Sequence, residues 1–302
     1  MMDRDYIDAI IKVILESDMT DRNVKRVSLR PMTCEIRDGK EVYDCELNFS
    51  DVIGHSRAKL SEAWVASNLL IFTVFDGYLE VKYGLQEGGS FRNHYQHLPM
   101  NDDIELIQKD CYRIMKLIRN AAQHNLSSIA YNNGSYSIRY VFNGTEYILR
   151  INKNGMDCLY TLLINIIRES IIGLYGKFHT KGHFVGILRR LYEEMCSEVD
   201  IMTDEEGVRT NMTLSCIKLQ YSVRYPVANP VIIDESSKII FKHIANMAFV
   251  DPNGVKQYYS TDYAYKDYLL PQEIGVIEKN GERGYDTIEF DKSRLCDLWK
   301  IG

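Results

Sequence analysis

Two nearly identical stretches, RNHYQH at 92–97 and RNAAQH at 119–124, carry residue types that can bind an anion and exchange protons. Each stretch reads Arg-Asn, two variable residues, then Gln-His. A histidine exchanges protons near neutral pH, and the planar fork of an arginine matches two phosphate oxygens. Either stretch could therefore belong to an active site, so the elements that position them decide between the two.

The second stretch ends the clearest helix in the sequence, at 101–124, which Asn101, Asp102 or Asp103 would cap. One side of this helix is apolar, with Ile107, Cys111, Ile114, Ile118, Ala121 and Ala122 at helical spacing. The opposite side is basic and polar, with Lys109, Arg113, Lys116, Asn120 and Gln123, flanked by Arg119 and His124. An anion at that side would meet several cations together, although a polar helix face is more often simply solvated.

The first stretch has no such helix, because a glycine pair precedes it and a proline follows it. We expect a loop or a short helical turn at 92–97. His94 and His97 have the spacing of two metal ligands on a helix, but no acid and no third histidine stands within a turn of them, so no metal site is predicted. The 92–97 stretch is therefore expected to have no function, or to be a loop that lends Arg92 or His97 to a substrate.

The spacing of apolar residues predicts four further helices, at 3–16, 56–83, 155–174 and 183–199. A β-hairpin is predicted at 135–152, where alternating apolar residues flank Asn143-Gly144. The fold class expected from this order is α+β, with a central antiparallel helical bundle into which the hairpin is inserted. N- and C-terminal β-containing extensions would flank the bundle, and the predicted domains are 1–52, 53–200 and 201–302.

The composition indicates a globular cytoplasmic protein. The 302-residue chain is 45% hydrophobic and 26% charged, and its seven cysteines include no CxxC pair, which favours reduced thiols. No stretch resembles a signal peptide and no apolar run reaches the roughly 18 residues of a spanning helix, so no membrane contact is expected. A net charge of −6 argues against general adhesion to nucleic acid, so such binding needs a local basic surface.

The nine residues LIRNAAQHN at 117–125 resemble the signature of the HEPN superfamily, the higher eukaryote and prokaryote nucleotide-binding fold. That signature is Arg, a polar residue and, a few residues later, His, late in an amphipathic helix. The resemblance covers 51–176 and implies that the expected bundle is HEPN-like. Asn125 stands where glycine is commonest, and the hairpin departs from the simplest bundle, which leaves the subfamily open.

The resemblance implies a metal-independent endoribonuclease that cleaves RNA through attack by its 2′-hydroxyl. In that role His124 would exchange protons, Arg119 would hold phosphate oxygens, and Asn120 would orient the histidine or donate to the phosphate. Arg119 and His124 diverge by about 140° on an ideal helix. HEPN proteins pair two protomers to join their motifs, so a homodimer is expected. The residues expected to bind the RNA are Lys109, Arg113, Lys116 and Gln123.

Several alternatives remain open from the sequence. The superfamily suggests a toxin or anti-phage defence effector, with an antitoxin or another partner protein. The main alternative is a catalytically inactive HEPN-like dimer that binds or scaffolds. In a third, a structural α+β protein, Arg119 and His124 simply end a helix. The sequence contains no P-loop, GxGxxG or HExxH motif, so no cofactor is expected.

Overall fold

The computed structural model divides the chain into two compact units. The first comprises 1–26, 52–174 and 191–215, and the second comprises 27–51, 175–190 and 216–302. The described residues are 9, 32–38, 40–45, 60–86, 89–172, 180–220, 224–227, 231–245, 248–250, 254, 256–258, 260–279 and 284–301. The helix expected at 3–16 lies outside the described residues, apart from Ala9.

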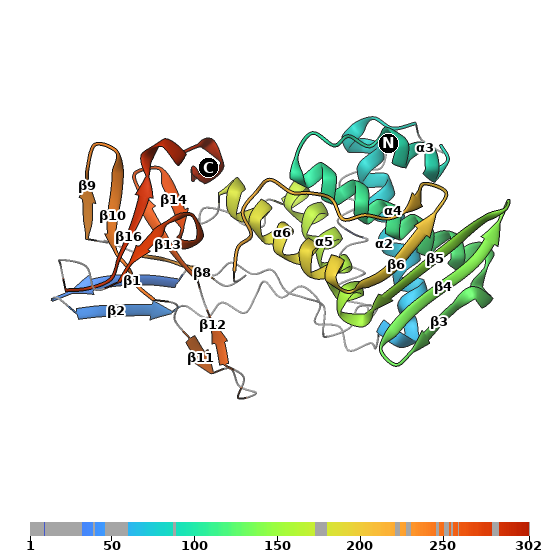
Figure 1. Cartoon of the computed structure of the whole chain (residues 1–302), viewed down its shortest axis with the longest axis horizontal. Helices are drawn as coiled ribbons and strands as arrows, with labels where there is room; N and C mark the ends of the chain where they lie inside the picture. Colours follow the sequence, from blue (N-terminus) through green and yellow to red (C-terminus); the bar gives the residue numbers. More distant parts are fainter. Residues whose placement is uncertain are drawn as a thin grey trace. The chain divides into compact units, whose positions relative to one another are not determined.

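Helix α4 (Asp103–His124) is the central element of the first unit (Figure 1). Asp102 caps it, because its carboxylate accepts a hydrogen bond from the backbone N–H of Glu105. The predicted apolar side is buried from Ile107 to Ala121. The helices that contact α4 are α2 (Leu60–Tyr83), α3 (Phe91–His97) and α5 (Lys153–Ile172). The last turns of α6 (Lys181–Ser197), from 191 onward, also belong to this unit.

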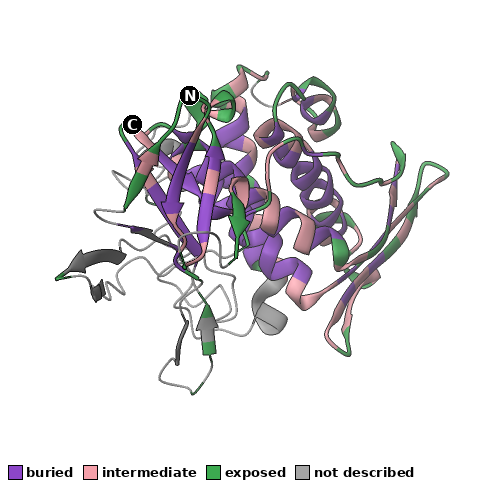
Figure 2. Ribbon diagram, turned by 60° about the vertical axis from the view of Figure 1, so that its left-hand side comes forward, coloured by how far each residue is buried: buried purple, intermediate pink, exposed green. Residues whose placement is uncertain are grey.

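A five-stranded antiparallel sheet completes the first unit. Its strands are, in spatial order, β3 (Ile129–Asn132), β4 (Ser135–Phe142), β5 (Thr145–Asn152), β6 (Val199–Asp204) and β7 (Gly207–Val208). Asn143 and Gly144 join β4 to β5 with φ of 48° and 78°, the left-handed conformation that a two-residue hairpin turn needs. Figure 2 shows buried residues alternating with more exposed ones along these strands; the buried ones are Tyr136, Ile138, Leu149, Ile151, Met202 and Asp204.

The predicted fold class, an α+β protein built on a central HEPN-like antiparallel bundle, is wrong. The helices do not close on one another around an inserted hairpin, because β3 and β6 pair with the outer edges of β4 and β5. The hairpin is therefore the middle of a sheet, and its buried face packs against α4 and α5 as a layer of the core. The unit is thus of mixed α/β architecture. Sequence spacing conceals this, because β6 lies beyond α6 and far along the chain from β5.

The second unit combines strands from both ends of the chain. One sheet has the order β14 (Tyr268–Pro271), β13 (Ser260–Tyr265), β8 (Arg224–Val227), β1 (Met32–Arg37) and β2 (Lys40–Cys45). A second sheet has the order β15 (Val276–Glu278), β16 (Thr287–Asp291), β10 (Lys238–Lys242) and β9 (Ile232–Asp234). A separate pair is formed by β11 (Ala248–Val250) and β12 (Lys256–Tyr258). Among the described residues, the short 3-10 helices are η1 (Leu126–Ser128), η3 (Gln272–Ile274), η4 (Lys292–Arg294) and η5 (Asp297–Trp299).

Aromatic side chains hold the core of the second unit together. The rings of Phe241 and Tyr263 are 5.1 Å apart, and Phe290 lies 5.6 Å from Phe241 and 5.7 Å from Tyr263. All three are almost completely buried. Across the described ranges of both units, no helix is long and apolar enough to cross a membrane.

Candidate functional site

The two arginine–histidine stretches lie on adjacent helices of the first unit. Residues 92–97 fall within α3, which is a helix and not a loop; Ser90 caps it by accepting a hydrogen bond from the Asn93 backbone N–H. Residues 119–124 form the end of α4. A cavity of about 820 Å³ opens where these two helices meet the β4–β5 hairpin. Its lining residues are Gly89, Ser90, Phe91, Arg92, Lys116, Asn120, His124, Asn125, Tyr140, Phe142, Asn143, Thr145, Tyr147 and Glu205.

The cavity brings together one half of each stretch. Arg92 comes from the first copy, and Asn120 and His124 come from the second. The Arg92 side chain is 56% exposed and makes one ion pair, 3.2 Å from Nε to Glu206 Oε1. His124 is also exposed. A guanidinium, an amide and an imidazole thus face a common space that a phosphate could enter.

Two stacked tyrosines form the wall that the hairpin contributes. The rings of Tyr140 and Tyr147 are 4.7 Å apart and nearly parallel, at 2°. Burial, the charge of Glu205 and a hydrogen bond to Glu205 raise the pKa of Tyr147 to about 12. Burial and the neighbouring Tyr147 also raise the pKa of Tyr140. Both phenols are therefore neutral at pH 7, so they can stack on a base or donate a hydrogen bond but do not act as bases.

Arg119 is not among the described residues that line the cavity. Its guanidinium carbon lies 4.3 Å from the centre of the Phe91 ring, a cation–π contact between α4 and α3. Its Nη1 donates to Asn120 Oδ1 at 3.1 Å. Burial lowers the pKa of Arg119, and the nearby charges of Asp76 and Tyr112 partly offset this effect. Arg119 therefore orients Asn120 and α3 and does not reach into the cavity itself.

The basic side of α4 is largely occupied by protein carboxylates. Arg113 is 7% exposed, and its Nη2 lies 2.6 Å from Asp204 Oδ1 and 2.6 Å from the carbonyl of Gly207. Lys116 is 1% exposed, and its Nζ lies 2.5 Å from Glu205 Oε1. These cations hold the β6–β7 turn against α4, so they do not form an open basic surface.

The other two residues expected to bind RNA lie elsewhere on α4. Lys109 Nζ donates to the backbone carbonyl of Leu98 at 2.8 Å and sits 5.2 Å from the centre of the Tyr95 ring. Burial lowers the pKa of Lys109, partly countered by Glu206. Gln123 is exposed and is not among the described residues that line the cavity.

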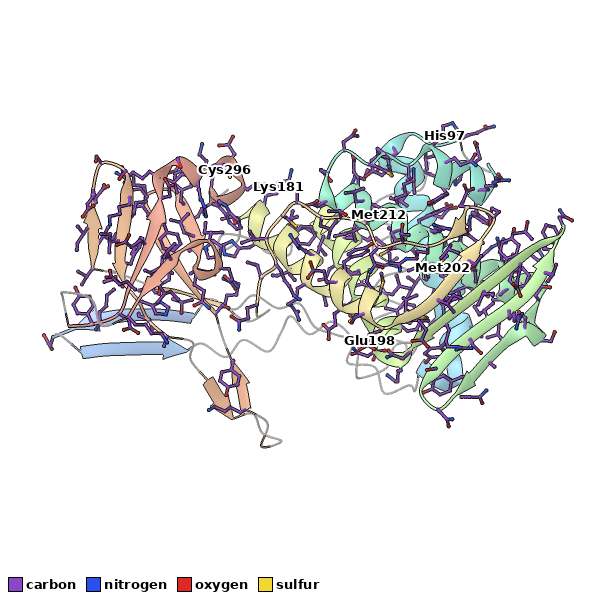
Figure 3. The ribbon with its side chains drawn as sticks, in the orientation of Figure 1. His97, Lys181, Glu198, Met202, Met212 and Cys296 are labelled. Carbon is purple, nitrogen blue, oxygen red and sulfur yellow. The ribbon has the colours of Figure 1, made fainter. Side chains whose placement is uncertain are left out.

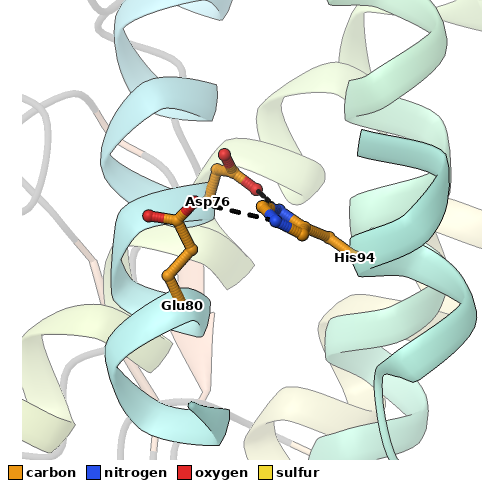
Figure 4. A group of neighbouring side chains, drawn as sticks. All are labelled: Asp76, Glu80 and His94. Atoms are coloured by element: carbon orange, nitrogen blue, oxygen red, sulfur yellow. Dashed lines mark hydrogen bonds and ion pairs between the residues drawn. The ribbon is translucent and has the colours of Figure 1, made fainter. Parts of the chain in front are cut away.

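His94, the buried histidine of the first stretch, contacts two acids of α2 (Figure 4). Its Nδ1 lies 3.0 Å from Asp76 Oδ1, and its Nε2 lies 3.7 Å from Glu80 Oε1 and 2.9 Å from the carbonyl of Gln86. Burial lowers the pKa of His94, but the bonds to Asp76 and Gln86 and the charges of both acids outweigh burial, and the pKa is raised. The spacing of residues around His94 does not reveal this cluster, because both acids lie on the preceding helix, far from His94 in sequence.

A second buried histidine, in the second unit, has a structural role. Thr180 Oγ1 lies 2.6 Å from His183 Nδ1 and accepts a hydrogen bond from the His183 backbone N–H, so it caps the first turn of α6. His183 Nε2 lies 3.1 Å from Asp262 Oδ1, and Asp262 also pairs with Arg224. The order Thr–His–Asp resembles a hydrolytic triad, but Thr180 is only 2% exposed and its hydroxyl is already the helix cap.

Comparison of the chain with protein-family models, with curated proteins and with solved structures gave no match.

Proposed function

We propose that the cavity between α3, α4 and the β4–β5 hairpin binds single-stranded RNA and cleaves it without a metal ion. The observation that supports this most directly is the presence of Arg92, Asn120 and His124 around one cavity that also contains the stacked Tyr140–Tyr147 pair. Arginine suits phosphate, a flat aromatic wall suits an unpaired base, and histidine suits proton transfer.

In the proposed reaction His124 takes the proton of a ribose 2′-hydroxyl. The 2′-oxygen attacks the adjacent phosphorus, the bond from phosphorus to the 5′-oxygen breaks, and the products carry a 2′,3′-cyclic phosphate and a 5′-hydroxyl. Arg92 would exchange its exposed carboxylate partner, Glu206, for a phosphate oxygen, since such surface pairs contribute little stability. Asn120 would donate its amide N–H groups to the same phosphate while Arg119 holds its Oδ1.

The 5′-oxygen needs a proton as it leaves. Among the described residues that line the cavity, His124 is the one imidazole. We therefore retain the homodimer as part of the proposal, with the same histidine of a second copy as the acid. The setting in which the RNA is cut, a cytoplasmic toxin or defence effector restrained by an antitoxin or another partner protein, is proposed from the sequence motif alone.

A second candidate function is RNA binding without cleavage. The position of Arg119 favours it, because this arginine stacks on Phe91 and leaves the motif without the phosphate contact that the sequence analysis assigned to it. The two candidates differ in one respect: a binding module would retain its RNA intact.

The test is incubation of the full chain with single-stranded RNA in EDTA. We expect cleavage by the wild type and a loss of at least about 100-fold in His124→Ala, in line with the contribution of general acid–base catalysis. His97→Ala is the matched control, because this histidine is exposed on α3 and is not among the described residues of the cavity; its side chain is labelled in Figure 3. Equal cleavage by His124→Ala, or intact RNA with the wild type, would refute the nuclease.

A further inference from the structure

The cluster of Asp76, Glu80 and His94 brings together three side chains that can bind a metal ion. Asp76 and Glu80 stand one turn apart on α2, and His94 reaches toward them from α3 (Figure 4). One ligand atom of each residue lies within 4.8 Å of the others. His94 is 1% exposed, so its ring cannot turn freely away from the acids.

The two ring nitrogens of His94 have different surroundings: Nδ1 contacts Asp76, and Nε2 faces Glu80 and the Gln86 carbonyl. Asp76 Oδ1 receives a hydrogen bond of 2.6 Å from the Tyr112 hydroxyl and lies 3.0 Å from His94 Nδ1. A carboxylate that accepts Nδ1–H fixes the ring and directs the lone pair of Nε2 outward, as the outer carboxylate does in many zinc sites. Asp76 therefore supports the histidine and leaves Nε2 to face the other groups.

The groups around Nε2 are spaced as metal ligands are. Two atoms each about 2.0–2.2 Å from a tetrahedral zinc lie roughly 3.3–3.6 Å apart. Glu80 Oε1 is 3.7 Å from His94 Nε2, and the Gln86 carbonyl oxygen is 2.9 Å from it. These two values bracket that spacing, so each oxygen lies within a few tenths of an ångström of the separation from Nε2 that a shared zinc ion needs.

The space beside Nε2 is kept clear by a glycine. A Cβ built on Gly89 would lie 2.8 Å from His94 Nε2 and 3.0 Å from the Gln86 carbonyl oxygen. A second cavity of about 310 Å³ reaches the site from outside, and its lining includes Gln86, His94 and His97. Water and a small cation can therefore enter, and water can fill the remaining coordination position.

We propose that His94 Nε2, Glu80 Oε1 and the Gln86 carbonyl bind one divalent transition-metal ion of the zinc class, with Asp76 as the positioning carboxylate. The ion replaces a proton on Nε2, which passes to solvent, and links α2 to α3. Its role is structural, so it is separate from the metal-independent chemistry proposed for the larger cavity.

Calorimetric titration of the EDTA-treated full chain with zinc chloride tests the site. We expect one zinc ion per chain, loss of binding in His94→Ala and Glu80→Gln, and binding weakened about 10- to 100-fold in Asp76→Asn. His97→Ala is the control: His97 lines the same cavity but is not a proposed ligand, so this variant should bind zinc as the wild type does. Magnesium and calcium, which prefer oxygen-only sites, should not compete.

Circular dichroism of each variant verifies the fold, and Gly89→Ala provides a second variant that keeps every ligand but fills the space beside Nε2. We expect Gly89→Ala to lower zinc affinity at least 10-fold. Zinc binding that survives in folded His94→Ala, or its absence from the folded wild type, would overturn the proposal. Neither outcome bears on RNA cleavage, which is measured in EDTA.

Discussion

The central guanidinium carbon of Arg119, on α4, lies 4.3 Å from the centre of the Phe91 ring, on α3. This contact joins the helix that carries His124 to the helix that carries Arg92. The arginine of the motif therefore acts on the cavity by holding α3 against α4, together with the contacts that Lys109 makes to Leu98 and Tyr95.

A double-mutant cycle on Arg119 and Phe91 measures that contact. Phe91→Ala also removes packing against Phe72, whose ring lies 5.1 Å away, so the single variant alone overstates the pair. We expect a coupling free energy of about 1 kcal/mol from urea unfolding of the wild type, Arg119→Ala, Phe91→Ala and the double variant. Strict additivity would show that the stacking contributes nothing.

The buried pair of Arg113 and Asp204 gives the clearest stability prediction. Asp204 has a completely buried side chain, so Arg113→Ala leaves a carboxylate with its main cation removed. We expect a loss of about 3–5 kcal/mol in the free energy of unfolding. Arg139→Ala is the control, because Arg139 pairs with Glu146 at a similar distance, 2.7 Å, but its side chain is 76% exposed. We expect this variant to lose less than about 1 kcal/mol in the free energy of unfolding. Similar losses in both variants would contradict the assignment.

Acid should destabilise the second unit through Asp262. Burial alone would raise the pKa of this carboxyl, but Arg224 and His183 outweigh burial and lower the pKa from 3.8 to about 2. Because the folded pKa is the lower one, the unfolded chain binds the proton first. The stabilisation is complete above about pH 4 and is lost as the pH falls toward about 2, by an amount on the order of 2 kcal/mol. Urea unfolding across that range should show a shallower pH dependence in Asp262→Asn; an unchanged slope would refute this.

RNA affinity should depend on the stacked tyrosines. Base–aromatic stacking contributes about 1–3 kcal/mol per base, so Tyr147→Ala should weaken binding of a short single-stranded oligonucleotide by roughly 5- to 150-fold. Tyr131→Ala is a matched control, because the Tyr131 ring lies 4.5 Å from the ring of Tyr136 in the same sheet but Tyr131 is not among the described residues of the cavity. Fluorescence anisotropy measures both, and equal affinities would place the RNA elsewhere.

Local sequence patterns predicted the elements of the first unit better than their assembly. The spacing of apolar residues located α4, and Asn143-Gly144 located the hairpin, because both signals lie within one element. The spacing did not predict that Arg113 and Lys116 are buried, because the acids that neutralise them lie on the β6–β7 turn, far along the chain. The polar face of α4 was expected to contact solvent or substrate, but it contacts the acids of the β6–β7 turn in the same unit.

The same limitation applies to the two motif copies. RNHYQH was expected to be a loop or a short helical turn because glycines and a proline flank it, and the Ser90 cap starts a seven-residue helix inside those boundaries. That it lends Arg92 or His97 to a substrate stays a prediction; Arg92 and His124 line the same cavity. Pairing of separate helices depends on long-range packing, which six-residue patterns do not encode.

We propose that RNA is cut by attack of its own 2′-hydroxyl in the cavity that His124 lines. The most direct measurement uses two oligonucleotides that are identical except for a single 2′-deoxy sugar on the 5′ side of the mapped cleavage site, incubated with the wild type in EDTA. We expect cleavage of the all-ribose strand, with a 2′,3′-cyclic phosphate on the upstream product, and no cleavage at the deoxy position. Comparable cleavage at the deoxy position, or no cleavage of either strand, would contradict the claim.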